Sequence, residues 1–114
     1  MKILADANHE PATMTPEGAQ RRVLSYGGDL MLVHFTFEAG ISAAIHSHPH
    51  AQVGYVVSGE IDLMMEGHPT TRLTAGGSYY VPPQVRHGII TYAPTVLLDS
   101  FTPLRADFLV ELTQ

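Results

Sequence analysis

The chain has 114 residues, a formal net charge of −5 at pH 7 and no cysteine, and 45% of its residues are hydrophobic. This length and composition predict one globular domain, and the missing cysteines exclude disulfides, thiolate catalysis and cysteine zinc sites. The six lysines and arginines form no cluster, which argues against a nucleic-acid or anionic-membrane surface.

Turn residues divide the chain into many short segments. Residues 1–25 contain Pro11, Pro16 and Gly18, and we interpret them as an N-terminal arm and edge strand, followed by a single domain over residues 26–114. After Pro103, the apolar spacing of residues 105–112 predicts one short helix. Alternation and turn signals predict these strands: Arg21–Tyr26, Asp29–Glu38, Gln52–Val57, Glu60–Glu66, Thr70–Leu73, Ser78–Val81, Gly88–Tyr92 and Thr95–Phe101.

This pattern of strands and turns favours an all-β sandwich or barrel, and a small barrel can hold one ligand in its mouth. No apolar run approaches the roughly 20 residues of a membrane helix. An acid at Asp6 interrupts the N-terminus too early for a signal peptide. We therefore expect a cytoplasmic protein that does not bind a membrane.

Four side chains predict a metal site. His46 and His48 are two residues apart, a spacing that puts both on one face of an extended strand. Gln52 follows beyond a turn at Pro49, and His87 lies in a second turn-rich segment. Three imidazoles and one amide oxygen suit a single divalent transition metal, and Zn, Ni, Fe and Mn all remain open.

The segment from Thr95 to Phe101 is apolar except where Asp99 interrupts it. By strand parity Asp99 shares a face with Leu97 and Phe101, so its carboxylate is either buried with a partner or lines a cavity. On spacing alone, a structural salt bridge between Asp99 and Arg105 is an equally good interpretation. Phe101 is either core or a wall of the cavity.

Two segments carry motifs that resemble those of the cupins, which are RmlC-like double-stranded β-helices, or jelly-roll barrels. The first segment has Gln52 where many members have Glu, and the second has Gln84 for the usual Gly and Thr91 for the usual Asn. They read Gly40-x5-His46-x-His48-x3-Gln52-x6-Gly59 and Gly76-x5-Pro82-x-Gln84-x2-His87-x3-Thr91.

Longer strings resemble the pectin-degradation cupins of the KdgF type, with Ala51 where a Glu is expected. The resemblance implies conversion of 4,5-unsaturated monouronates, released from pectin or alginate, into open-chain keto sugars. It implies a metal held by the four predicted ligands and a substrate beside Asp99, Phe101 and Arg105. The strings are His-Ser-His-Pro-His-x-Gln-Val-Gly-Tyr, Tyr-Val-Pro-Pro-x-Val-x-His-Gly and Leu-Leu-Asp-Ser-Phe-Thr-Pro-Leu-Arg-x-Asp-Phe.

The chemistry of these residues suits a small anionic sugar. A neutral Gln52 leaves the site the full charge of the metal, which attracts an acid more strongly than a glutamate-bearing site does. Arg105 offers a planar two-pronged donor for a carboxylate. Asp99 is the candidate general acid and base.

Two other functions and several minor features stay open. An Fe(II) cupin dioxygenase could use the same histidines, and a non-catalytic cupin could bind metal and sugar without turnover. We expect His50 at the rim of the site rather than as a ligand, and cavity-lining roles for Tyr55 and Tyr79. A β domain of this size leaves sheet edges exposed, so we expect a homodimer with residues 1–25 as the covering arm.

Overall fold

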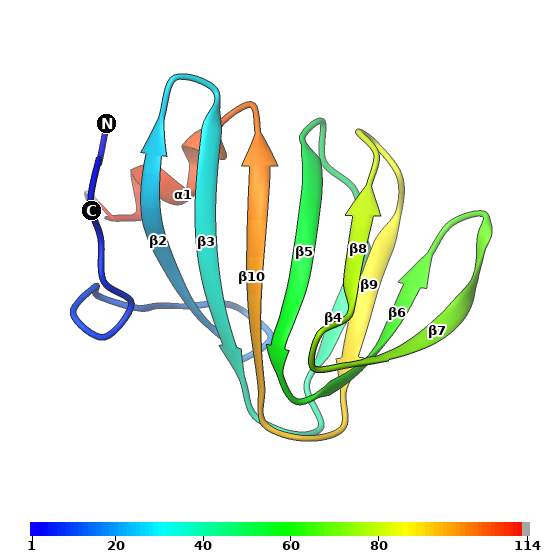
Figure 1. The fold of residues 1–114 in the computed structure, drawn as a ribbon. Coiled ribbons are helices and arrows are strands. Elements are labelled where there is room, and N and C mark those ends of the chain that lie inside the picture. Colours follow the sequence, from blue (N-terminus) through cyan, green and yellow to red (C-terminus); the bar gives the residue numbers. More distant parts are fainter. Residues whose placement is uncertain (113–114) are drawn as a thin grey trace.

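The computed structural model describes residues 1–112, which fold into two antiparallel sheets (Figure 1). The six-stranded sheet has the order β1-β2-β3-β10-β5-β8, and the four-stranded sheet has the order β4-β9-β6-β7. Residues 113 and 114, the end of the predicted domain, lie outside the described part. The strands are β1 (Thr13–Met14), β2 (Gln20–Gly27), β3 (Leu30–Phe37), β4 (Ser42–His46), β5 (Ala51–Ser58), β6 (Glu60–Met65), β7 (His68–Thr74), β8 (Ser78–Val81), β9 (His87–Thr91) and β10 (Thr95–Thr102).

The predicted all-β jelly roll with a short C-terminal helix is confirmed. Helix α1 spans Ala106–Leu112. Strand alternation behaves as expected: in β3, Met31, Val33 and Phe37 are buried, whereas Leu30 is exposed. Within residues 1–112 no helix is long and apolar enough to cross a membrane.

Strand β4 was not predicted, and it changes how the histidine pair is built. Its sequence, Ser-Ala-Ala-Ile-His, is poor in the β-branched and aromatic residues that mark strands. His46 is the last residue of β4, and His48 lies in the loop that leads to β5. The prediction that both histidines sit on one strand is therefore wrong: His48 reaches the site from the loop between β4 and β5, and not through strand parity.

The apolar core lies between the two sheets, and the predicted site residues lie at one end of it. One cluster combines side chains of β3, β5, β8 and β10 with Ile61, Leu63 and Ile89 from β6 and β9. A second cluster packs Phe108 of α1 onto β2, β3 and β10. Helix α1 thus covers the inner face of the larger sheet where the smaller sheet does not extend (Figure 1).

The N-terminal residues run along the edge of the larger sheet. β1 pairs with β2, and Lys2 forms an isolated bridge with Tyr26. Between β1 and β2, the Thr15 hydroxyl accepts a hydrogen bond from the backbone N–H of Ala19 at 3.0 Å, which holds a tight turn. Glu17 lies within this turn. The division of the chain into an arm over residues 1–25 and a domain from residue 26 stays a prediction.

Candidate metal centre and its pocket

Three imidazoles converge at one end of the sandwich. His46 ends β4, and its partner in the antiparallel register is His87, the first residue of β9. The loop after β4 brings in His48. The ring centroids lie 4.5 Å apart for His46 and His87 and 5.0 Å apart for His48 and His87, and the candidate ligand atoms all lie within 4.8 Å of one another. The predicted histidine cluster is therefore present and could hold a metal ion.

Backbone carbonyls fix the tautomer of all three rings. A carbonyl can only accept, so the Nδ1 that faces it carries the hydrogen and Nε2 is left with its lone pair. A metal needs neutral imidazoles of this kind. Burial, and next the charge of Arg105, lower the pKa of His48 to about 4. The three Nδ1-to-oxygen distances are 2.9 Å for His46 and Ala44, 3.0 Å for His48 and His50, and 3.0 Å for His87 and Val85.

The Gln52 amide is oriented by its neighbours. Its Nε2 donates to Oδ1 of Asp99 at 2.9 Å, so its Oε1 points the other way, to 3.0 Å from Nε2 of His48. With His48 neutral and protonated on Nδ1, both facing atoms are acceptors and cannot bond to each other. Two acceptors at this spacing suit a shared cation with ligand distances of about 2.0–2.2 Å. The donor set therefore fits a divalent transition metal.

Asp99 lies deep in the same pocket, on β10, and is 3% exposed. Its register partners are Val33 on β3 and Gly54 on β5, and Gly54 is in turn paired with Tyr79 on β8. The Tyr79 hydroxyl donates to Oδ1 at 2.9 Å, the same oxygen that Gln52 contacts. No described residue donates to Oδ2. Burial raises the pKa of the Asp99 carboxyl to about 6, although the two donated hydrogen bonds oppose that shift.

Gly54 makes room for this arrangement. A Cβ at residue 54 would overlap the ring of Tyr79 and Oδ1 of Asp99. The missing side chain therefore allows the tyrosine to lie across β5 and reach the carboxylate. Tyr79 was expected to line the cavity, and it does, whereas the contribution of Gly54 was not predicted.

Arg105 lies in the linker between β10 and α1. It donates to Asp107 at 3.1 and 2.9 Å and not to Asp99, so the salt bridge to Asp99 considered above is absent from the described structure. Its guanidinium lies 4.0 Å from the ring centroid of Phe108 and 5.2 Å from that of Phe101. Phe101 is 2% exposed and packs edge-on against His48, with centroids 5.7 Å apart.

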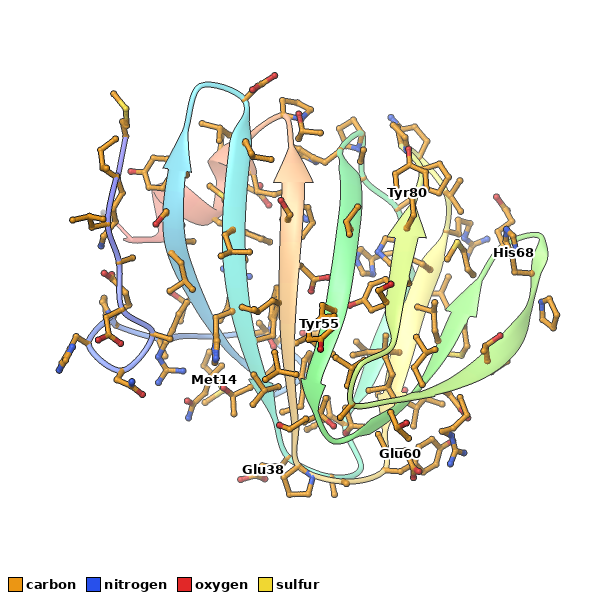
Figure 2. The ribbon with its side chains drawn as sticks, in the orientation of Figure 1. Met14, Glu38, Tyr55, Glu60, His68 and Tyr80 are labelled. Carbon is orange, nitrogen blue, oxygen red and sulfur yellow. The ribbon has the colours of Figure 1, made fainter. Side chains whose placement is uncertain are left out.

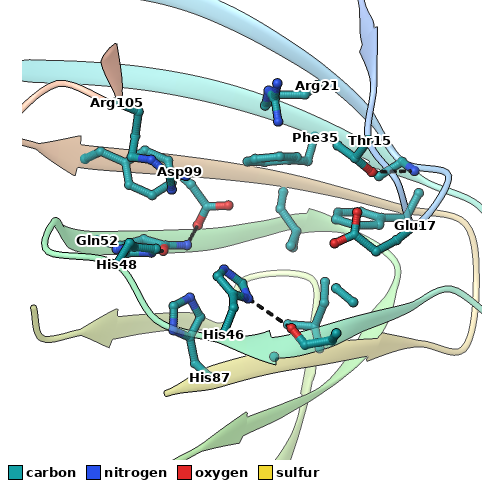
Figure 3. A pocket seen from close by; sticks show the side chains of 18 of the residues that line it. Thr15, Glu17, Arg21, Phe35, His46, His48, Gln52, His87, Asp99 and Arg105 are labelled. Atoms are coloured by element: carbon teal, nitrogen blue, oxygen red, sulfur yellow. Dashed lines mark hydrogen bonds between the residues drawn. The ribbon is translucent and has the colours of Figure 1, made fainter. Parts of the chain in front are cut away.

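A pocket of about 310 Å³ connects these groups (Figure 3). All seven predicted site residues line it: His46, His48, Gln52, His87, Asp99, Phe101 and Arg105. Unpredicted lining comes from Glu17, Arg21 and Phe35, opposite the histidines. Tyr55 is not among the lining residues; it is 47% exposed on the outer face of the sheet (Figure 2), so that prediction is wrong. The roles of the lining residues stay proposals.

The fold and the histidine cluster define the class of protein. The sequence profile of the Cupin domain matches residues 33–101, more than half of the chain. The chain therefore belongs to the cupin family, and within it to the KdgF-type cupins to which it is similar over most of its length. It is 34% identical over 95 residues to the pectin degradation protein KdgF of Dickeya dadantii (strain 3937), covering 82% of this chain and 86% of that protein.

Two solved structures are similar over nearly the whole chain. The crystal structure of an RmlC-like cupin from Shewanella frigidimarina superposes with a TM-score of 0.88 at 34% identity, covering 95% of this chain and 96% of the other. The structure of KdgF from Halomonas sp. superposes with a TM-score of 0.86 at 30% identity, covering 92% and 98%. The family likeness therefore extends beyond the two motifs to the complete sandwich.

Proposed function

We propose that this protein is a metal-dependent cupin that converts an unsaturated uronate monosaccharide, derived from pectin or alginate, into its open-chain keto form. The observation that carries the proposal is the placement of the buried Asp99 beside the histidine cluster in one pocket. Similarity to KdgF, a pectin degradation protein, supports the substrate class. A pocket of about 310 Å³ is at the small end of ligand sites and suits a single sugar ring.

The proposed reaction is an isomerisation that needs no co-reactant. The C1 hydroxyl of the cyclic sugar loses its proton and becomes the aldehyde, the bond between C1 and the ring oxygen breaks, and the electron pair stays on that oxygen as an enolate at C5. A proton then adds to C4, the C4–C5 double bond is lost and C5 becomes a ketone. The proton removed equals the proton added, so one carboxyl group can carry it.

Asp99 is the proposed carrier of that proton. Its Oδ1 is held by Gln52 and Tyr79, so Oδ2 is the atom that exchanges a proton with the sugar. Burial raises the pKa of its carboxyl to about 6, close to neutrality, where a group both accepts and releases a proton efficiently. We infer that Asp99 accepts the C1 proton and returns it to C4.

The remaining residues bind and orient the sugar. His46, His48, Gln52 and His87 would hold the metal, which when bound supplies Lewis-acid polarisation of the sugar oxygens. Arg105 is the proposed partner of the sugar carboxylate, with its guanidinium already braced by Asp107 and Phe108. Phe101 is the proposed apolar wall that keeps water from the reacting face.

The test uses the monomer product of a pectin or alginate lyase and a trap for ketones. Metal-loaded protein should speed the loss of the conjugated absorbance, yield a keto acid and consume no oxygen. Oxygen uptake with the iron-loaded protein would favour the dioxygenase instead. Binding of the sugar with decay no faster than in buffer would leave a non-catalytic binding protein. Either of these results overturns the proposal.

We also propose a homodimer, formed by the outer face of the larger sheet. Two rows of side chains cross β3, β10, β5 and β8 without an acidic or basic group other than a histidine, so two copies can meet there without charge repulsion. The exposed Tyr55 and Tyr80 project from this face (Figure 2). The rows are His34–Leu98–Tyr55–Ser78 and Leu32–Ser100–Val53–Tyr80.

Sedimentation tests this assembly. We expect a dimer for the wild-type protein and a monomer for Tyr55→Glu, because the carboxylate is buried without a partner at the centre of the contact. Lys2→Glu, in the N-terminal segment, is the control, and we expect it to sediment as a dimer. A monomer for this variant and a dimer for Tyr55→Glu would show that the N-terminal segment, and not the sheet, forms the interface. A wild-type chain that sediments as a 12.4 kDa monomer would contradict the homodimer.

A further inference from the structure

His50 connects two parts of the site although its ring is not in the metal cluster. Its Nε2 lies 3.2 Å from the carbonyl oxygen of Leu104. Because a carbonyl can only accept, Nε2 carries the hydrogen and donates it. The backbone carbonyl of the same residue accepts the Nδ1 hydrogen of His48 at 3.0 Å. One residue therefore contacts both the ligand His48 and a segment 54 positions further along the chain.

The segment that His50 contacts carries Arg105. Leu104 stands directly before Arg105 in the linker between β10 and α1. Its carbonyl also accepts a hydrogen bond from the N–H of Ala106, the first residue of α1, at 3.0 Å. The hydrogen bond from His50 therefore reaches the point where the chain turns from strand to helix, directly before Arg105, whose side chain lines the pocket.

The second ring nitrogen shows that packing alone does not explain this histidine. Within the described part of the chain, Nδ1 of His50 is buried and has no hydrogen-bond partner. A buried acceptor without a donor destabilises the folded protein, and an apolar residue would fill the space without that cost. The hydrogen bond to Leu104 is the interaction that a histidine makes here and an apolar residue cannot.

We propose that His50 is a positioning residue that fixes the Arg105 guanidinium relative to the metal ligands. The proposed uronate has its ring oxygens at the histidine cluster and its carboxylate at Arg105. Both ends of the sugar are therefore bound at once only if the distance between the histidine cluster and the Arg105 guanidinium is fixed. This inference rests on the proposed function. It predicts that loss of the hydrogen bond weakens binding of the sugar acid more than binding of the metal.

The experiment compares three variants of the zinc-loaded protein. His50→Leu removes the donor, His50→Gln keeps an N–H that can reach Leu104, and His68→Leu on β7 is a control at an exposed histidine. The measurements are the zinc Kd by competition with a chelating dye, the Kd for galacturonate by calorimetry, and kcat and KM for the unsaturated monouronate. Galacturonate is a saturated acid, so its binding is measured without turnover.

We expect His50→Leu to raise KM and the galacturonate Kd about tenfold while kcat and the zinc Kd change less than about threefold. His50→Gln should restore both values to within about threefold of wild type. The proposal is overturned if His50→Leu and His50→Gln have equal KM and galacturonate Kd values, or if the zinc Kd rises as much as KM. If the wild-type protein binds galacturonate but does not turn over the unsaturated monouronate, the proposed reaction is refuted, whereas the comparison of galacturonate Kd values still decides the role of His50.

Discussion

Gln52 donates from Nε2 to Oδ1 of Asp99 over 2.9 Å while its own Oε1 faces Nε2 of His48 at 3.0 Å. An amide is the only common side chain that offers an oxygen to a cation at one atom and an N–H to a carboxylate at the other. A glutamate at this position would offer the oxygen but would place a second carboxylate against Asp99. The amide therefore explains how one residue could serve both the candidate metal centre and the proposed acid and base.

Gln52→Glu tests this double role. We expect the variant to bind zinc at least as tightly as the wild-type protein, because the ligand oxygen gains a charge, while kcat falls about 10²-fold. The fall follows from the loss of the donor to Oδ1 and from repulsion between two carboxylates. Zinc content and kcat are measured on the same preparation. A Glu variant with wild-type kcat would show that the hydrogen bond to Asp99 has no part in catalysis.

Asp99→Asn removes the proposed proton carrier and keeps the shape of the side chain. We expect kcat to fall by about 10²–10⁴-fold with the metal still bound, since general acid and base catalysis contributes in that range. The readout is the rate of loss of the conjugated absorbance, with metal analysis of the same sample. If turnover persists within a few-fold, another group moves the proton.

Tyr79 and Tyr80 form a matched pair on β8, because they point to opposite faces of the sheet. The Tyr79 hydroxyl donates to Asp99, and Tyr80 is 55% exposed on the outer face. Tyr79→Phe should lower kcat about tenfold at nearly constant KM, because one of two hydrogen bonds that orient the carboxylate is lost. Tyr80→Phe should leave both constants unchanged. Equal effects of the two substitutions would contradict a specific contact to Asp99.

Gly54→Ala should destabilise the fold as well as the site. The added methyl would overlap the Tyr79 ring and Oδ1 of Asp99, and an overpacked core costs about 1–3 kcal/mol. Gly27→Ala is the control, because its added Cβ meets only the flexible side chain of Met1, at 3.3 Å. Urea unfolding of the two variants should separate them. A Gly54 variant as stable as the control would mean that Tyr79 moves aside at little cost.

Much of the architecture follows from local pattern. Alternation and turn residues located β3 and β10, and Asp99 was found because it interrupts an apolar strand. The cupin spacings then brought His46 and His87 together, which the β4–β9 register explains. The strands follow from alternation and turn residues, whereas the meeting of His46 and His87 followed from the resemblance to the cupin motifs.

Features that depend on tertiary contacts could not be read in that way. The end of β4 at His46 is not marked by its residues, so the loop position of His48 was missed. Tyr55 and Tyr79 look alike as strand tyrosines in the sequence. Only the register of β5 against β8 and β10 shows that the Tyr55 side chain points to the outer face of the sheet and the Tyr79 side chain to the inner face. Arg105 pairs with Asp107 and not Asp99, because the start of α1 brings a nearer carboxylate.

The most direct test of the central claim is proton NMR of the unsaturated monouronate in the presence of metal-loaded and metal-free protein. We predict that the vinylic C4 proton signal disappears faster with the metal-loaded protein than with the metal-free protein, with the appearance of an open-chain 5-keto acid. Asp99→Asn should abolish that difference. A vinylic signal that decays at the same rate with and without the metal-loaded protein would contradict the proposed function.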